Sequence, residues 1–369
     1  MSLILVLRCC ILVITSQVSQ ESFTNMEKIR FGRTGLVVSK IAFGGIPIQR
    51  LSRADGIKLV REALDEGVNF IDTAHGYGQS EECIGEALRG RSRQEVILAT
   101  KSPALDKVGF LANLEESLRR LKTDYIDIFQ HHNISEKEKM EKVIGPDGAF
   151  EGMVQAIRQG KVRFPGFTSH ILSVAAEMIK TDRFDTVQIP LNFIDHQALD
   201  EVIPLARERQ MGMIAMKPLG GGLLDSARLC FRYLSQFPDL VPDPGIERIE
   251  ELREILAVAK EKGPLTQQEN KEIEEYRRLL GKTWCHRCDY CQPCPEGIPI
   301  SMVLAAKSFA RRMPFEAAVR FVGDSLKKAE NCTECRTCVE RCPYGLDIPV
   351  LLKERRASWE VFLQDRVWN

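Results

Sequence analysis

The chain has 369 residues, which is more than one ordinary domain and fewer than three. Its 51 lysines and arginines balance its 51 aspartates and glutamates, so no basic surplus indicates nucleic acid and no charged block indicates a disordered tail. The 12 cysteines are unusual, because most of them lie between Cys285 and Cys342. Cysteines crowded at CxxC spacing in a large chain favour metal binding over a disulfide framework.

Residues 1–25 form an apolar extension. The run from Leu3 to Thr15, broken only by Arg8, is shorter than the about 20 residues that a membrane span needs. It resembles a signal-peptide core, but no Lys or Arg precedes it and no clear A-x-A site follows. The alternative is an over-extended start codon, with Met26 as the natural start. We favour that reading, and expect a cytoplasmic protein without a membrane partner.

From residue 39 to about 260, short β-branched runs alternate with amphipathic helical stretches, a pattern typical of parallel βαβ construction. The expected strands are Ser39–Phe43, Val68–Asp72, Val96–Lys101, Ile126–His132, Val162–Phe167, Thr186–Pro190, Met213–Met216 and Leu240–Asp243. The expected helices are 53–66, 80–89, 110–121, 149–159, 171–180, 198–210, 223–235 and 248–261. This alternation predicts an α/β fold, a closed (β/α)₈ TIM barrel.

Two details of the barrel are less regular. Pro242 and Pro244 make the last strand weak, because proline is poor in a central strand. Phe31–Val38, with a turn at 33–35, is expected to form a hairpin that closes the bottom of the barrel.

Four polar side chains follow the carboxyl ends of neighbouring strands, where such barrels do their chemistry. Asp72 ends the second strand, Tyr77 follows it, Lys101 ends the third, and His132 ends the fourth. Hydride reduction of a carbonyl needs a proton donor, and a nearby ammonium lowers the pKa of a phenol from about 10. We expect Asp72 to hold Lys101, Lys101 to act on Tyr77, and a histidine to orient the substrate. Strand alternation selects His132 rather than His131 for that role.

Several segments in the same order resemble the aldo/keto reductase superfamily, over about Met26 to Lys260. They are Ile41–Gly45, Asn69–Ala74, Tyr77-Gly78, Ala99–Lys101, Leu118–Asp127, His132, Gly160–Arg163 and Gly166–His170. The resemblance implies a catalytic tetrad of Asp72, Tyr77, Lys101 and His132, with Tyr77 as general acid.

The resemblance also implies a nicotinamide cofactor, NADP(H) or NAD(H), bound at the barrel mouth without a GxGxxG motif. The matching positions are Gly44, Gly45, Thr168, Ser169, Gln188, Met216, Lys217, Pro218, Leu219, Gly220 and Glu254. The segment 216–220 would meet the ring and phosphates, although its glycines are also compatible with a simple flexible turn. The choice of nicotinamide stays open, because the carboxylates of Glu247 and Glu251 favour a free 2′-hydroxyl and neighbouring arginines a 2′-phosphate.

Two cysteine motifs end the chain. The first is Cys285-x₂-Cys288-x₂-Cys291-x₂-Cys294-Pro295, and the second is Cys332-x₂-Cys335-x₂-Cys338-x₃-Cys342-Pro343. The second is the two-cluster ferredoxin pattern, in which the fourth cysteine binds the other cluster. We therefore assign one [4Fe–4S] cluster to Cys285, Cys288, Cys291 and Cys342, and another to Cys332, Cys335, Cys338 and Cys294. Two zinc sites are disfavoured, because each motif has three evenly spaced cysteines followed by Cys-Pro. A subset of aldo/keto reductases has a similar tail.

We thus expect a barrel over residues 26–262, a helical linker over 263–283, and a small, mostly helical ferredoxin-like domain over 284–369, with helices at 300–312, 314–328 and 348–364. The expected function is NAD(P)H-dependent reduction of a small-molecule aldehyde or ketone. An alternative is an electron-transfer or redox-sensing protein whose barrel binds nucleotide without turnover, with a redox partner at the clusters.

Overall fold

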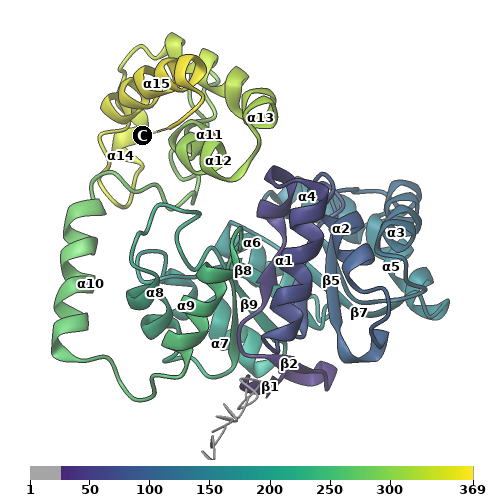
Figure 1. Ribbon diagram of the computed structural model, residues 1–369. Helices are drawn as coiled ribbons and strands as arrows, with labels where there is room; N and C mark the ends of the chain where they lie inside the picture. The colour runs from purple at the N-terminus through teal and green to yellow at the C-terminus, as the bar shows by residue number, and fades with distance from the viewer. Residues whose placement is uncertain (1–25, 369) are drawn as a thin grey trace, which may run out of the picture.

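Eight parallel strands form the centre of the protein in the computed structural model, which describes residues 26–368. They are β3 (Phe43–Gly44), β4 (Phe70–Asp72), β5 (Ile97–Ser102), β6 (Ile126–His131), β7 (Val162–Thr168), β8 (Thr186–Pro190), β9 (Gly212–Met216) and β10 (Leu240–Asp243), hydrogen-bonded in sequence order. The two edges meet through a parallel bridge between Gly44 and Gly245 and a hydrogen bond from Ala42 N–H to Pro242 O at 3.0 Å. The expected (β/α)₈ barrel is therefore confirmed (Figure 1).

Helices surround the barrel. They are α1 (Arg53–Asp65), α2 (Ser80–Ala87), α3 (Lys107–Leu121), α4 (Lys137–Ile144), α5 (Ala149–Arg158), α6 (Leu172–Lys180), α7 (Val202–Glu208), α8 (Ala227–Leu234) and α9 (Ile249–Ala259). Several begin at a side chain that accepts the backbone N–H three residues on, as Ser52, Asp106 and Ser226 do. These caps mark where the chain leaves each strand-end loop and turns back along the barrel.

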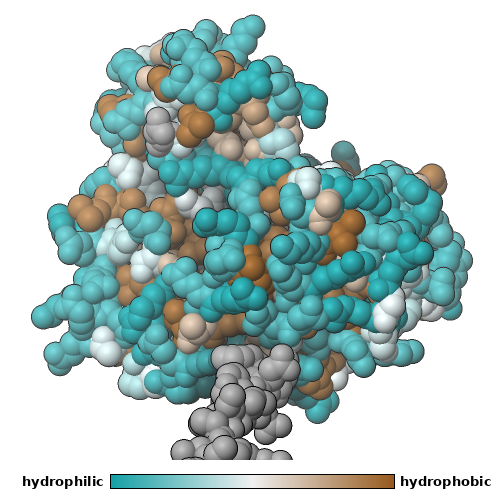
Figure 2. All heavy atoms as spheres, in the orientation of Figure 1, coloured by the Kyte–Doolittle hydropathy of each residue, from teal (hydrophilic) through white to brown (hydrophobic). Residues whose placement is uncertain are grey.

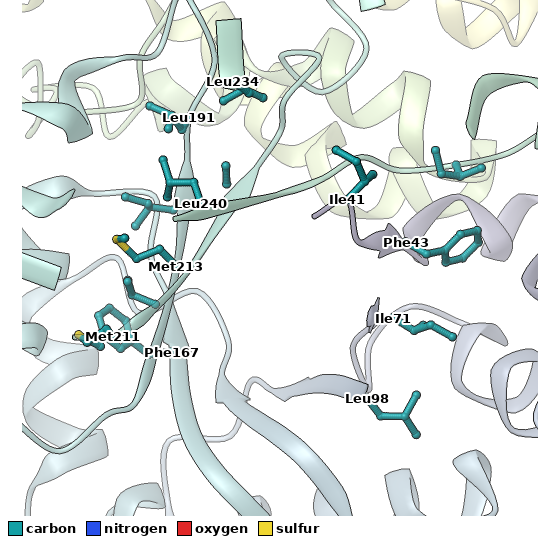
Figure 3. Close-up of a cluster of buried hydrophobic side chains, with 14 of the residues drawn as sticks. Ile41, Phe43, Ile71, Leu98, Phe167, Leu191, Met211, Met213, Leu234 and Leu240 are labelled. Atoms are coloured by element: carbon teal, nitrogen blue, oxygen red, sulfur yellow. The ribbon is translucent and has the colours of Figure 1, made fainter. Parts of the chain in front are cut away.

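The core has two layers because side chains alternate along each strand. Leu98 of β5 and Phe129 of β6 belong to the larger layer, between the strands and the helices, part of which is drawn in Figure 3. Ala99 and Ile128 point the other way, into the barrel interior. Phe31 joins this inner layer, with its ring 5.4 Å from that of Phe70, and plugs the bottom of the barrel.

The hairpin at the bottom differs in detail from the expectation. Its strands are β1 (Lys28–Arg30) and β2 (Val37–Ser39), which pair antiparallel on either side of a 3₁₀ turn. Ser39 thus belongs to the hairpin, so the expected first barrel strand Ser39–Phe43 is wrong, and only Phe43–Gly44 joins the sheet. The reason is local: Ser39 N–H donates to Asn69 Oδ1 and its Oγ donates to Ile41 O, which turns the chain before the barrel.

The C-terminal region, residues 284–368, covers the barrel mouth. A charged helix, α10 (Gln267–Leu280), leads to it, and it contains α11 (Ile300–Leu304), α12 (Ala306–Arg312), α13 (Phe315–Lys328), α14 (Thr337–Glu340) and α15 (Ile348–Asp365). The expected helix 300–312 is thus divided in two. In Figure 1 this region lies at the end of the barrel opposite β1 and β2. Its own apolar core includes Val322, Trp359 and Phe362.

Two loops of the barrel hold the C-terminal region in place. Ser308 Oγ donates to Gly221 O at 3.2 Å, and Gln49 Nε2 donates to Arg312 O at 3.3 Å. A Cβ atom on Gly220 would collide with the ring of Trp284. The glycine stretch after β9 is therefore a packing surface for the C-terminal region, a role that the sequence analysis missed.

Two findings bear on the outer surface. Hydrophilic residues dominate the face of the molecule shown in Figure 2, with apolar residues interspersed among them. Across residues 26–368, none of the helices combines the length and the apolar character that crossing a membrane requires. The predictions for residues 1–25 lie outside the described residues.

Candidate active site

The four expected catalytic side chains line one cavity of about 1370 Å³ at the carboxyl ends of the strands. Lys101 Nζ donates to Asp72 Oδ2 and to Thr73 O, the latter at 2.6 Å. It lies 5.3 Å from the ring centroid of Tyr77, whose ring packs edge-on against that of His132 at 5.8 Å. Three neighbouring strands thus bring an acid, an amine, a phenol and an imidazole together.

The charges of this group are set by burial and by each other. Burial is the largest single influence on the pKa of Lys101 and lowers it, but the charges of Asp72, Tyr77 and Asp243 together outweigh burial. The net pKa is raised, so Lys101 is an ammonium. Burial raises the pKa of Tyr77, and Lys101 opposes this only in part. The expected net lowering of the Tyr77 pKa is therefore wrong, because desolvation of the phenolate is the larger effect. Tyr77 is a protonated phenol at neutral pH.

The two adjacent histidines face opposite sides of the sheet, as strand alternation predicted. His132 lines the cavity, and burial, with the charge of Lys101, lowers its pKa to about 3. It is therefore a neutral imidazole with one donor and one acceptor nitrogen. His131 is buried among helix-layer aromatics, with its ring 4.9 Å from that of Phe110 and 5.8 Å from that of Phe184.

A second carboxyl, Asp243 at the end of β10, completes the floor of the site. Gln188 Nε2 donates to Asp243 Oδ2 at 3.0 Å and to Asp72 Oδ2 at 3.4 Å, so one amide joins both acids. Burial raises the pKa of Asp243 well above its ordinary value, and the charge of Asp72 is the next largest cause of this rise. A Cβ on Gly44 would lie 2.9 Å from Asp243 Oδ1, so only glycine fits there. The sequence analysis missed Asp243 as a site residue, although its place at the carboxyl end of an expected strand indicated that it faces the barrel mouth.

Most of the expected cofactor contacts lie at the same cavity. Those that line it are Gly44, Gly45, Thr168, Gln188, Met216, Lys217, Pro218 and Leu219. Three others are not among the lining residues: Ser169 is buried with its Oγ donating to Ile171 O, Gly220 packs under Trp284, and Glu254 is exposed on α9. Gln188 Oε1 is buried and has no hydrogen-bond partner in the described chain, so it can accept a hydrogen bond from a ligand.

Seven of the eight cysteines of the two motifs lie in the loops of the C-terminal region, and Cys338 lies in α14. Burial raises the pKa of Cys338, and neighbouring thiols add to the rise, namely those of Cys332, Cys335 and Cys294. The thiol of Cys342 likewise raises the pKa of Cys288. The thiols of Cys285 and Cys288 raise the pKa of Cys291. Cys294 lines the cavity and Cys335 is exposed. Within residues 26–368, no three His, Cys, Asp or Glu side chains converge as they do around a single metal ion.

Comparison with known proteins gives two family matches. Residues 40–229 match the Aldo/keto reductase family, and residues 284–347 match a 4Fe-4S dicluster domain. The chain is 32% identical over 234 residues to the uncharacterized oxidoreductase YrpG of Bacillus subtilis, covering 55% of this chain and 70% of the relative. It is 30% identical over 220 residues to L-galactose dehydrogenase of Arabidopsis thaliana, covering 54% and 68%.

Solved structures share the fold. The holo form of aldo-keto reductase AKR11C1 from Bacillus halodurans matches with a TM-score of 0.59 at 23% identity, over 68% of this chain and 96% of that one. The thermostable aldo-keto reductase Tm1743, in complex with the inhibitor epalrestat, matches with a TM-score of 0.59 at 24% identity, over 68% and 99%.

Proposed function

Because the chain belongs to the aldo/keto reductase family and carries a 4Fe-4S dicluster domain, we propose that it reduces an aldehyde or ketone with a nicotinamide cofactor, NADP(H) or NAD(H), in the cytoplasm. The observation that carries this proposal is the convergence of Asp72, Tyr77, Lys101 and His132 on one cavity. These four side chains come from the ends of three neighbouring strands, and together they meet the needs of carbonyl reduction.

The cavity fits a nicotinamide. The unpartnered Oε1 of Gln188 and the nearby Thr168 are suited to a carboxamide, and the lining segment 216–219 to the ring and phosphates. Ser169, Gly220 and Glu254 stay in this proposal on the family resemblance alone. When bound, the reduced nicotinamide supplies the hydride.

The chain's own residues supply the proton and the charge. Tyr77 Oη donates its proton to the carbonyl oxygen of the substrate, and the ammonium of Lys101 stabilises the phenolate that remains. Asp72 holds Lys101 in place by their hydrogen-bonded ion pair. Neutral His132 donates an N–H to the same carbonyl oxygen and orients it.

The Tyr77→Phe variant tests this function. We expect anaerobically purified protein to oxidise NADPH or NADH with some member of an aldehyde and ketone panel. Tyr77→Phe should abolish that turnover and leave cofactor binding, measured by fluorescence titration, unchanged. Reduction at the wild-type rate by this variant would refute the role of Tyr77.

We further propose two [4Fe–4S] clusters, one on Cys285, Cys288, Cys291 and Cys342 and the other on Cys332, Cys335, Cys338 and Cys294. The thiols that act on each other electrostatically fall into these same two sets, which supports the exchange of the fourth cysteine between motifs. About eight iron and eight sulfide per chain are expected, and Cys338→Ser should remove about half. Unchanged iron content would refute the assignment.

A second candidate function is electron exchange with a redox partner. The exposure of Cys335 favours it, because a cluster bound there would lie near the surface, while Cys294 of the same set lines the cavity. Cluster reduction by NADPH under anaerobic conditions, followed by visible absorbance, would support this candidate, and its absence would exclude NADPH as the electron source.

A further inference from the structure

Two arginines of the C-terminal region reach into the cavity that holds Tyr77 and His132. Arg287 lies in the first cysteine motif and Arg312 ends α12, and both line the cavity. Their guanidinium carbons lie 5.0 Å and 5.2 Å from the ring centroid of Phe309. Two positive charges are therefore held around one aromatic ring at the roof of the site.

Neither arginine has an acidic partner. Of the acidic side chains in residues 26–368, none forms an ion pair with Arg287 or Arg312. Arg312 Nε donates to Ser308 O at 3.0 Å, but its Nη2 is buried and has no hydrogen-bond partner among the described atoms. Asp289, which lines the same cavity, and Asp195 act electrostatically on Arg287 but form no ion pair with it, and Asp195 is already engaged by Trp284 and His286.

The amine of Lys217 adjoins the same surface. Lys217 Nζ lies 3.3 Å from His170 Nδ1, and both residues line the cavity. Burial lowers the pKa of Lys217 well below its ordinary value, and the charges of Arg287 and Arg312 lower it further. Two guanidinium groups held away from water without an ion-pair partner among the described residues are costly to the fold unless an anion joins them.

We propose that Arg287 and Arg312 bind an anionic group of the carbonyl substrate, a carboxylate or a phosphate, and that the enzyme therefore prefers carbonyl compounds that carry such a group. This inference rests on the proposed function. A guanidinium matches both anions, because its fork of N–H groups binds two oxygens at once.

The place of the arginines favours the substrate over the cofactor as the source of the anion. Arg312 acts electrostatically on Tyr77, and both arginines act on His170, which in turn interacts with His132. The positive charge therefore lies beside the proton donor. Gly221 and Gln49, in the loops after β9 and β3, hold helix α12, which fixes Arg312 in the wall of the cavity that Tyr77 also lines. The diphosphate of the dinucleotide offers the same chemistry, and the test separates the two sources.

The test compares 4-carboxybenzaldehyde with its neutral methyl ester. Wild-type protein should prefer the acid. Arg312→Met should lower the ratio of kcat/KM for acid over ester by about 10- to 100-fold, the usual effect of one charge-assisted hydrogen bond, and Arg312→Lys should restore part of it. The matched control is Arg278→Met, which removes the same charge from an exposed site on α10. Visible absorbance of the clusters checks that each variant is intact.

Binding without turnover gives an independent readout. Benzoate should bind the wild-type protein in calorimetry and benzamide should not, and Arg312→Met should lose the benzoate. Two results would overturn the proposal and assign the arginines to the cofactor. The first is an equal fall in kcat/KM for the acid and for its methyl ester in Arg312→Met. The second is weaker NADPH binding by this variant while its benzoate binding stays intact. If the protein reduces no carbonyl compound, the proposed function fails, whereas Arg312-dependent benzoate binding would still support the anion site and its absence would overturn it.

Discussion

Asp243 is expected to keep its proton at pH values where a free carboxyl is already ionised, and Asp243→Asn tests this. Burial and the charge of Asp72 raise the pKa of Asp243 well above 3.8. Above that ordinary value the unfolded chain ionises this carboxyl, while the folded chain holds the proton until the raised pKa is reached. Folding takes up a proton in this window, so wild-type stability falls by about 1.4 kcal/mol for each pH unit within it.

Asparagine removes this pH dependence and keeps the shape of the side chain. Its oxygen can still accept from Gln188 Nε2, which lies 3.0 Å from Asp243 Oδ2. Asp243→Asn should therefore become more stable relative to the wild type as the pH rises above the ordinary carboxyl pKa of 3.8. Urea unfolding of anaerobically purified protein, followed by tryptophan fluorescence at several pH values, measures the difference.

The matched control is the neighbouring acid. Asp72→Asn leaves the buried ammonium of Lys101 without its partner and should lose about 3–5 kcal/mol throughout this pH range. The two carboxyls share Gln188 but are expected to respond in opposite directions. If Asp243→Asn is destabilised like Asp72→Asn, or if its difference from the wild type does not change with pH, Asp243 is ionised and the reasoning is wrong.

Three further predictions follow from the site and its cover. Lys101→Met should abolish turnover and destabilise the fold by about 3–5 kcal/mol, because Asp72 is left buried and unpaired; activity and urea unfolding check both. His132 is neutral above a pKa of about 3, so the pH profile of kcat should show no step near 6.5, and such a step would contradict its assignment. Gly220→Ala should loosen the C-terminal region through a clash with Trp284, so limited proteolysis should cut the linker before residue 284 faster than in the wild type.

Strand order and the tetrad were predictable from the sequence because both depend on local patterns. Each strand is a short apolar run, and the end of such a run in a parallel barrel always faces the same mouth. The prolines of β10 weakened that prediction, yet the strand forms. Pro242 O and Pro244 O accept the N–H groups of Ala42 and Gly44, so the prolines close the barrel as acceptors, a role that needs no N–H of their own.

Other features depend on contacts between distant segments. Helix α4 was not among the expected helices, although Met140 and Val143 supply the apolar side of one turn and are buried. The roles of Gly220 and Asp243 were missed because a single residue carries no periodicity. The role of Gly220 becomes clear only from its contact with Trp284 of the C-terminal region. The role of Asp243 becomes clear only from its hydrogen bond with Gln188 on another strand.

The C-terminal region and the barrel share one cavity, which would couple the proposed clusters to the proposed reductase site without any electron transfer between them. Arg287 lies between two proposed cluster ligands, Cys285 and Cys288, so the loop that presents its charge is the loop that a cluster would order. Metal binding of this kind is coupled to folding of the ligand loops. Removing iron with a chelator should therefore lower kcat/KM for 4-carboxybenzaldehyde more than for its methyl ester, whereas a change in cluster oxidation state alone should alter neither. A response to oxidation state would instead indicate that electrons reach the site.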